Sequence, residues 1–256
     1  MLKIRKVFGE SMRVLNCSRS IEGKIIIKRF INGLWVLYSS IAAICISALA
    51  VINSTWIYKL VVQKYNLKSI IGISEEALMD EYKGLINYLQ NPFIDKLKFN
   101  NFSMSTYGEI HFYEVKRIFI ALIIIVAIFM ITLLLSVILK GEKYSITNTT
   151  SLKNFNNSAN LLIIFFIGIV VLYFIDFSWA FTIFHKIFFR NDYWIFDPRV
   201  DPIIIALPEE LFMICGGAIL SLLFIMIITV KLKYYSNRSS VKVNSIGLEK
   251  SINRTV

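Results

Sequence analysis

Four long apolar runs alternate with polar segments along the chain. The runs cover residues 34–52, 118–139, 161–184 and 211–230, and only the third contains a charged residue, Asp176. A helix needs about 20 apolar residues to cross the ~30 Å hydrocarbon core of a bilayer, where its backbone must hydrogen-bond to itself. The pattern therefore predicts an all-α membrane protein with four transmembrane helices, at about residues 34–54, 117–139, 160–184 and 209–231.

The four spans divide the remaining chain into segments on two sides of the membrane. We expect a basic N-terminal segment over residues 1–30, a four-helix membrane domain over residues 31–235 and a tail over residues 236–256. Two connecting segments, residues 55–116 and 185–208, fall together on the side opposite the termini.

The longer connecting segment carries signals of ordered structure. Ser74 followed by two glutamates is typical of a helix N-terminus, because a serine side chain caps and acids complement the helix dipole. Pro92 stops such a helix after Gln90. Residues 55–116 are therefore predicted to form a small cap seated on the helix bundle.

Composition and charge settle the class and the orientation. Residues are 56% hydrophobic and only 18% charged, whereas soluble domains have about 25% charged residues, so an ordinary soluble enzyme and a disordered chain are excluded. The segments on the terminal side hold 17 Lys and Arg against 4 acids, and the opposite side holds 11 against 13. The positive-inside rule places both termini in the cytoplasm and the cap outside. The net charge of +11 is thus a topology signal that also attracts anionic membrane lipids, and no nucleic-acid motif accompanies it.

The chain has only two histidines, His111 and His185, and the topology brings both to the outer membrane boundary. Histidine carries protons near neutral pH, so the pair is a candidate acid–base couple. On a helix, Glu114 shares the face of His111 and is placed to orient its ring. The competing interpretations are interfacial hydrogen-bonding residues and a zinc site, and neither a metal nor another cofactor is expected.

A dense aromatic and polar segment follows His185. An aromatic belt at the headgroup level explains the rings, but a lipid or acyl-ester substrate calls for apolar walls together with a few polar groups. Asp176 is a further candidate, because a carboxyl group inside a span is costly and is usually functional or part of a buried network. The expected substrate-contacting residues are Phe112, Tyr113, Glu114, Asp176, Phe188, Phe189, Asn191, Asp192, Tyr193 and Trp194.

These segments resemble a known signature. Its two parts are Glu109-Ile110-His111-Phe112-x-Glu114-Val115 and Phe184-His185-x-Ile187-Phe188-Phe189-x-Asn191-Asp192-x-Trp194-x-x-Asp197-Pro198, followed by Asp201 and Pro208-Glu209. The sequence resembles the bacterial lipoprotein intramolecular transacylases (Lit) over roughly residues 31–232. The resemblance implies a multi-pass protein of the bacterial cell membrane, with four helices under an extracellular cap that holds the active site.

The resemblance also implies a reaction. The substrate would be a diacylglyceryl-modified lipoprotein with a free N-terminal cysteine, whose sn-2 acyl chain moves to the cysteine amine and leaves a lyso-form lipoprotein. Attack closes a ring of about eight atoms, which a pocket that fixes the conformers promotes. The substrate amine is the nucleophile, so His111 and His185 would act as base and acid, in either assignment. Asn191, Tyr193, Tyr113 or backbone N–H groups are candidates to stabilise the oxyanion.

Two other functions fit the same topology. The first is a non-enzymatic four-span scaffold or sensor whose cap binds a partner. The second is a membrane acyltransferase or hydrolase that acts on free phospholipid, which usually needs an activated nucleophile or water.

Overall fold

The fold is built from helices of very different lengths. A computed structural model describes residues 2–140 and 149–252, so part of the connection between the second and third predicted spans lies outside the described residues. The helices in the described parts are α1 (Leu2–Ile52), α2 (Thr55–Lys64), α3 (Leu67–Ile71), α4 (Glu75–Gln90), α5 (Thr106–Lys140), α6 (Thr149–Ile175), α7 (Phe177–Phe188), α8 (Ile203–Ala206) and α9 (Glu209–Ile252).

Four of these helices form the membrane bundle. Stretches long and apolar enough to cross a bilayer lie in α1 (Glu22–Ile52), α5 (Thr106–Ser136), α6 (Ser151–Ile175) and α9 (Glu209–Ser240). Many large apolar side chains on them are exposed, for example Ile128 and Ile164, as expected where lipid covers the surface. The prediction of an all-helical protein with four spans is confirmed, and α5 starts earlier than predicted, at Thr106.

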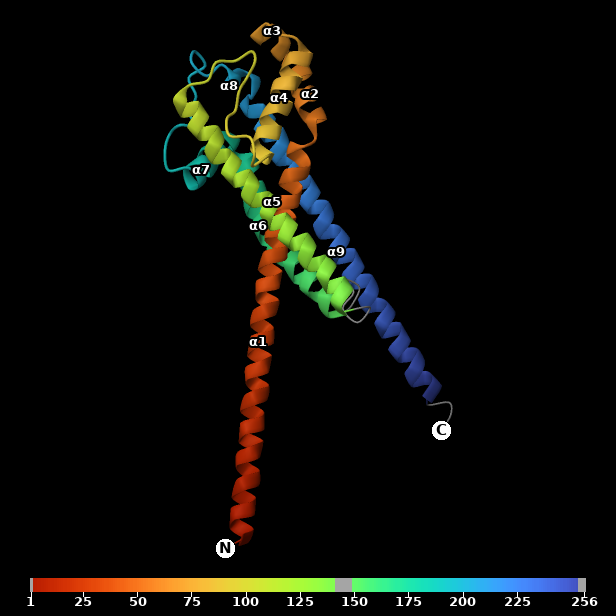
Figure 1. The fold of residues 1–256 in the computed structure, drawn as a ribbon. Helices are drawn as coiled ribbons and strands as arrows, with labels where there is room; N and C mark the ends of the chain where they lie inside the picture. Colours follow the sequence, from red (N-terminus) through yellow and green to blue (C-terminus); the bar gives the residue numbers. More distant parts are fainter. Residues whose placement is uncertain (1, 141–148, 253–256) are drawn as a thin grey trace.

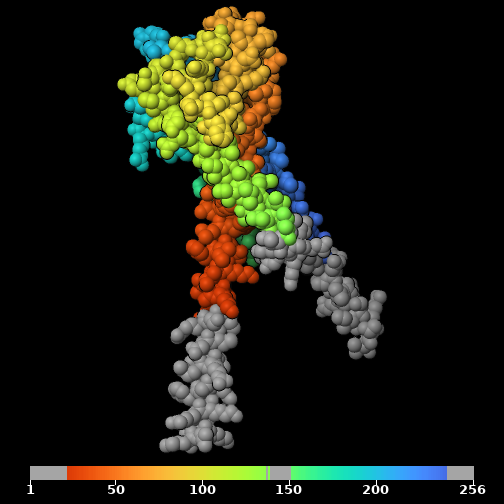
Figure 2. Space-filling model, in the orientation of Figure 1, coloured from red at the N-terminus to blue at the C-terminus, as the bar shows by residue number. Residues whose placement is uncertain are grey.

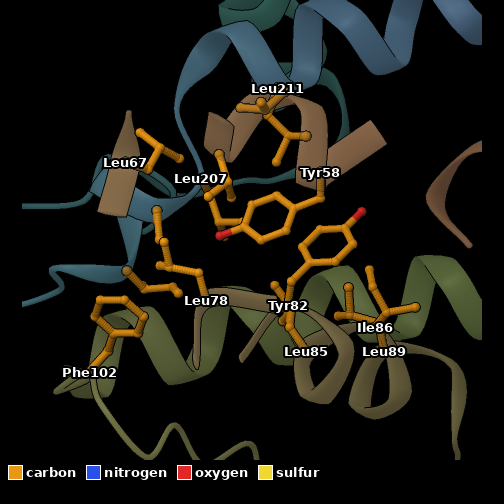
Figure 3. Packing of buried hydrophobic residues seen from close by; sticks show 14 of the residues in the cluster. Tyr58, Leu67, Leu78, Tyr82, Leu85, Ile86, Leu89, Phe102, Leu207 and Leu211 are labelled. Carbon is orange, nitrogen blue, oxygen red and sulfur yellow. The ribbon is translucent and has the colours of Figure 1, made fainter. Parts of the chain in front are cut away.

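A small helical cap sits at one end of the bundle. It contains α2, α3, α4 and α8, whereas α1 begins and α9 ends at the opposite end (Figure 1). In the space-filling view the cap is a compact block above the splayed helices (Figure 2). Its core includes the fully buried Tyr58 and Leu78, and the Tyr58 and Tyr82 rings stack at 4.2 Å (Figure 3). Leu207 and Leu211 enter the same core, so the start of α9 anchors the cap to the bundle.

The cap helix α4 forms where its signals predict it. The Ser74 side chain accepts a hydrogen bond from the Ala77 N–H at 3.1 Å, and the helix ends at Gln90. Buried Glu81 on this helix then fixes the irregular segment 91–105. Its Oε1 accepts hydrogen bonds from the backbone N–H groups of Asn100 at 2.8 Å and Asn101 at 2.6 Å.

The third apolar run departs from the prediction of one continuous helix over residues 160–184. Helix α6 ends at Ile175, and Asp176 adopts an extended conformation as the N-cap of α7. The Asp176 carboxylate accepts a hydrogen bond from the Trp179 N–H at 2.9 Å. A capping carboxylate satisfies the free N–H groups of a new helix, which is the physical reason for the break. Asp176 is therefore an exposed cap, and its predicted place as a buried carboxyl inside a span is wrong.

Candidate functional site

The fold brings the two histidines together. His111 lies on the second turn of α5 and His185 lies near the end of α7. Their ring centroids are 6.0 Å apart and both side chains are buried, with 7% and 9% of their surface exposed. We call these two residues the histidine pair. Two proton carriers at this spacing are close enough to act on opposite ends of one small reacting group.

The tautomer of His185 follows from its hydrogen bond. Its Nδ1 lies 2.8 Å from the carbonyl oxygen of Phe181, and a carbonyl oxygen only accepts, so Nδ1 carries the proton. In the neutral ring Nε2 then has a free lone pair. Burial lowers the pKa of His185, which lies outside the four spans, below its ordinary value of 6.5, and the bond to Phe181 offsets part of this shift. His185 is thus poised as a neutral base.

Aromatic rings surround the pair. Phe189 packs edge-on against His111 at 4.7 Å and Trp194 stacks on His185 at 4.6 Å, while Phe181 lies 4.1 Å from His185. Phe196 lies 5.5 Å from His111. We call Phe181, Phe189, Trp194 and Phe196 the aromatic shell. Such a lining excludes water and lowers the local dielectric constant around the histidines.

A polar contact ties α5 to the loop that carries most of the shell. The side-chain amide of Asn191 donates a hydrogen bond to Oε1 of Glu114 at 2.9 Å. The Asn191 oxygen accepts a hydrogen bond from the Tyr193 N–H at 3.1 Å, and the Tyr193 ring stacks on Tyr107 at 4.5 Å. Glu114, Asn191 and Tyr193 therefore hold residues 189–202, the site loop, against α5.

Asp201 makes a second tie between the site loop and α5. Its carboxylate is buried and accepts hydrogen bonds from the Ser105 N–H at 2.6 Å and from the Ser105 hydroxyl at 2.7 Å. The Ser105 hydroxyl in turn accepts from the Gly108 N–H at 2.9 Å. Asp201 thus fixes the helix turn that precedes His111.

The remaining predicted residues occupy different positions. Phe112 is buried beside the pair, with its ring 6.0 Å from that of His111. Tyr113, Phe188 and Asp192 are exposed, and Asp176 belongs to the cap of α7. Sequence reasoning did not single out Phe181, Phe196 or the role of Asp201, although Asp201 stands in the quoted signature. Among the side chains that the structure describes, which lie within residues 22–138 and 151–240, no three His, Cys, Asp or Glu residues group as a metal ion requires.

Comparison with known proteins places the chain in a family. The family model described as lipoprotein intramolecular transacylase Lit matches residues 34–212. The in meso structure of this membrane-integral transacylase from Bacillus cereus is similar, with 29% sequence identity, a TM-score of 0.74 and coverage of 85% of this chain and 98% of that one. Structures of Bacillus cereus variants with one histidine replaced by arginine or by alanine match at 30% and 31% identity, with TM-scores of 0.63 and 0.59, covering 87% of this chain and 99% of each of theirs.

The remaining comparison adds no further relative, since no curated protein sequence matches the chain. The matched family region contains the histidine pair, Glu114 and the site loop. The chain is therefore a membrane enzyme and belongs to the lipoprotein intramolecular transacylase (Lit) family.

Proposed function

We propose that this transacylase moves the sn-2 acyl chain of a diacylglyceryl-modified lipoprotein to the α-amine of its N-terminal cysteine, with the histidine pair as acid–base catalyst. The observation that carries the proposal is the burial of two histidines with ring centroids 6.0 Å apart. Because the amine and the ester belong to one substrate, no enzyme nucleophile is needed. The product is a lyso-form lipoprotein with an N-acyl chain.

The proton balance of the reaction requires two transfers, and we propose the following division between the histidines. The substrate ammonium has two protons that the product amide lacks. His111 takes one and later gives it to the leaving glyceryl alkoxide. The free Nε2 of His185, supported by the Nδ1 bond to Phe181, takes the other when the amine attacks and then releases it to solvent. The C–N bond forms first, the C–O bond to the glyceryl oxygen then breaks, and acid–base help of this kind contributes about 10²–10⁴-fold.

The aromatic shell directs the ester to the amine instead of water. Attack closes a ring of about eight atoms, and a rigid pocket lowers the entropy cost of that closure. Phe112, Phe189 and Trp194 lie against the pair and would hold the reacting end of the acyl chain. The exposed Tyr113, Phe188 and Asp192 would meet the more distant parts of the lipoprotein.

The site would face the extracytoplasmic side. Lys and Arg are concentrated in the segments next to the start of α1 and the end of α9, and cytoplasmic segments carry this excess. The cap, the start of α5 and α7 lie at the other end of the bundle (Figure 1), and these two helices carry the histidine pair. Diacylglyceryl lipoproteins at the outer leaflet would reach the pair without crossing the membrane.

The test is the position of a labelled acyl chain. A bacterial host without such a transacylase expresses this chain together with a reporter lipoprotein, and the purified enzyme is also given a substrate labelled in the sn-2 chain. Mass spectrometry of the N-terminal lipopeptide is expected to show the label on the α-amine. A variant with both histidines changed to alanine is the negative control. A lipopeptide that keeps its free amine while the enzyme is well expressed and folded would refute the proposed substrate.

The pH dependence of acyl transfer follows from the lowered pKa of His185. A base with a lowered pKa stays deprotonated to a lower pH. The rate is therefore expected to remain constant as the pH falls through 6.5 and to decrease only at lower pH. The rate of N-acyl product formation in detergent micelles checks this, with thermal unfolding followed over the same pH range as a control for folding. An acidic limb with its midpoint at or above 6.5 would contradict the assignment of His185 as a buried neutral base.

A further inference from the structure

Unpaired polar atoms are concentrated at the histidine pair. In the described part of the chain, the buried side-chain atoms without a hydrogen-bond partner are Nδ1 of His111, Oε2 of Glu114, Nε1 of Trp194 and Oδ1 of Asn156. The first three belong to residues of the site. Buried polar groups are nearly always paired, because an unpaired one costs about 1–3 kcal/mol. A ligand that pairs them removes that cost.

The chemistry of two of these atoms defines the ligand. A carboxylate oxygen only accepts hydrogen bonds and an indole N–H only donates. Glu114 therefore calls for a donor, best satisfied by a cation, and Trp194 calls for an acceptor, best satisfied by an oxygen with negative charge. An α-ammonium and the carbonyl oxygen of an ester under attack provide this combination.

Oε2 of Glu114 and Nε1 of Trp194 lie beside different parts of the site. Glu114 follows His111 by one turn of α5, and its other oxygen is fixed by Asn191 at 2.9 Å. The Trp194 ring stacks on His185 with an interplanar angle of 29° and a centroid distance of 4.6 Å. One group thus stands on α5 and the other on the site loop, and both border the histidine pair.

We propose that the indole N–H of Trp194 stabilises the oxyanion of the acyl-transfer step and that Glu114 holds the substrate α-ammonium before attack. The inference rests on the proposed function and adds two residues to it. As the nitrogen attacks, the carbonyl π electrons move to oxygen, which accepts the Trp194 hydrogen bond without taking its proton. When the C=O bond forms again, the glyceryl oxygen leaves with its electron pair and is protonated by His111.

Trp194 fits the oxyanion better than the donors that sequence reasoning suggested. Asn191 already donates to Glu114 and accepts from Tyr193. Tyr113 is 53% exposed, and the Tyr193 ring is stacked on Tyr107. The indole N–H is buried and carries no competing bond, so it needs no desolvation at the moment of reaction.

The test of Trp194 separates chemistry from binding. Trp194→Phe removes the N–H and keeps an aromatic face on His185. Loss of one oxyanion donor costs about 10²–10³ in kcat. A dialkylglyceryl ether analogue of the substrate has no acyl carbonyl, so its inhibition constant is expected to stay the same. The matched control is Trp179→Phe, at a residue that is 51% exposed on α7, and it should leave kcat unchanged.

A second replacement covers the case in which Trp194→Phe fails to fold. Benzothienylalanine at position 194 in the full chain replaces the indole N–H by sulfur and keeps the ring shape. The same fall in kcat is expected with unchanged binding of the ether analogue. A kcat equal to that of the wild type with either replacement would overturn the role of Trp194.

The test of Glu114 uses binding alone. Glu114→Gln is expected to weaken inhibition by the ether analogue about 10- to 100-fold, the range for a hydrogen bond to a charged group. The same analogue without its α-amino group should bind the variant and the wild type equally. Glu109→Gln on the same helix is the control, since Glu109 pairs with Lys96 at 3.1 Å. If Glu114→Gln weakens the binding of both analogues equally, Glu114 does not contact the α-ammonium.

The outcomes also distinguish this inference from the proposed function. A wild-type enzyme that forms no N-acyl product refutes the proposed function and the inference with it. A wild-type enzyme that forms the product while its Trp194 and Glu114 variants match it refutes the inference alone.

Discussion

Replacing either histidine of the pair with alanine is expected to lower kcat for N-acyl product formation by about 10²–10⁴-fold, the usual contribution of a general acid or base. The double variant is expected to be no slower than the worse single variant. Each acyl transfer needs both proton transfers, one through each histidine, and groups that act as a unit are strongly non-additive. The binding of the ether analogue should change little, since acid–base catalysis acts on the reacting atoms.

Single-turnover rates with the labelled lipoprotein measure these effects. Lys186→Ala is the matched control, because Lys186 is the exposed neighbour of His185 and should leave the rate unchanged. If the double variant loses the product of the two single effects, the histidines act independently and the coupling of the two proton transfers is wrong. If one single variant keeps the full rate, that histidine has no part in the chemistry.

Replacing Asp201 with alanine is expected to lower both stability and activity. The change leaves the Ser105 N–H without its acceptor and removes two short hydrogen bonds to a buried carboxylate. Hydrogen bonds to charged groups are worth about 1.5–3 kcal/mol each, so the loss of two is expected to cost about 3–6 kcal/mol. The site loop is then released from α5, and kcat should fall with stability.

A glycine pair tests the same contact from the other side. A Cβ atom added at Gly108 would lie 2.6 Å from Oδ1 of Asp201, whereas one added at Gly84 in α4 would meet nothing within 4 Å. Alanine normally stabilises a helix relative to glycine by about 0.5–1 kcal/mol. Gly84→Ala should therefore stabilise the protein, and Gly108→Ala should destabilise it.

Thermal unfolding in detergent and kcat in the same micelles check the Asp201 variant and the two glycine variants together. Ile195→Ala is the control on the site loop, because its side chain is 63% exposed, and it should match the wild type in both measurements. An Asp201→Ala protein with wild-type stability and rate, or a Gly108→Ala protein more stable than the wild type, would show that the tie to Ser105 is not needed.

Much of the fold is readable from sequence because the bilayer imposes a length. Four apolar runs of about 20 residues leave few alternatives to four transmembrane helices. The start of the cap helix α4 is predicted by Ser74 and the two glutamates that follow it. The meeting of His111 and His185 also follows in outline, since topology puts both at one end of the bundle. The spacing of 6.0 Å does not follow, because it depends on how α7 and the site loop fold back.

The break between α6 and α7 has a local cause. Hydropathy does not reveal that Asp176 caps a new helix, since one hydrogen bond to the Trp179 N–H competes there with helix continuation in an apolar run. The site loop is hard to predict for a different, long-range reason. Its tie through Asp201 to Ser105 joins residues far apart in the chain, and the aromatic residues that end up at the pair look the same in sequence as those facing lipid.

The order of the helices has a consequence for biosynthesis. His111 lies on α5 and His185 on α7, so α6 must enter the membrane before the two rings can meet. The cap core is also incomplete until Leu207 and Leu211, at the start of α9, have been made. A nascent chain with only its first half inserted therefore holds one histidine and an unfinished cap. The complete site can therefore form only late in translation, after α9 has been made. A chain that ends before α7 has only one of the two histidines and is not expected to transfer acyl chains.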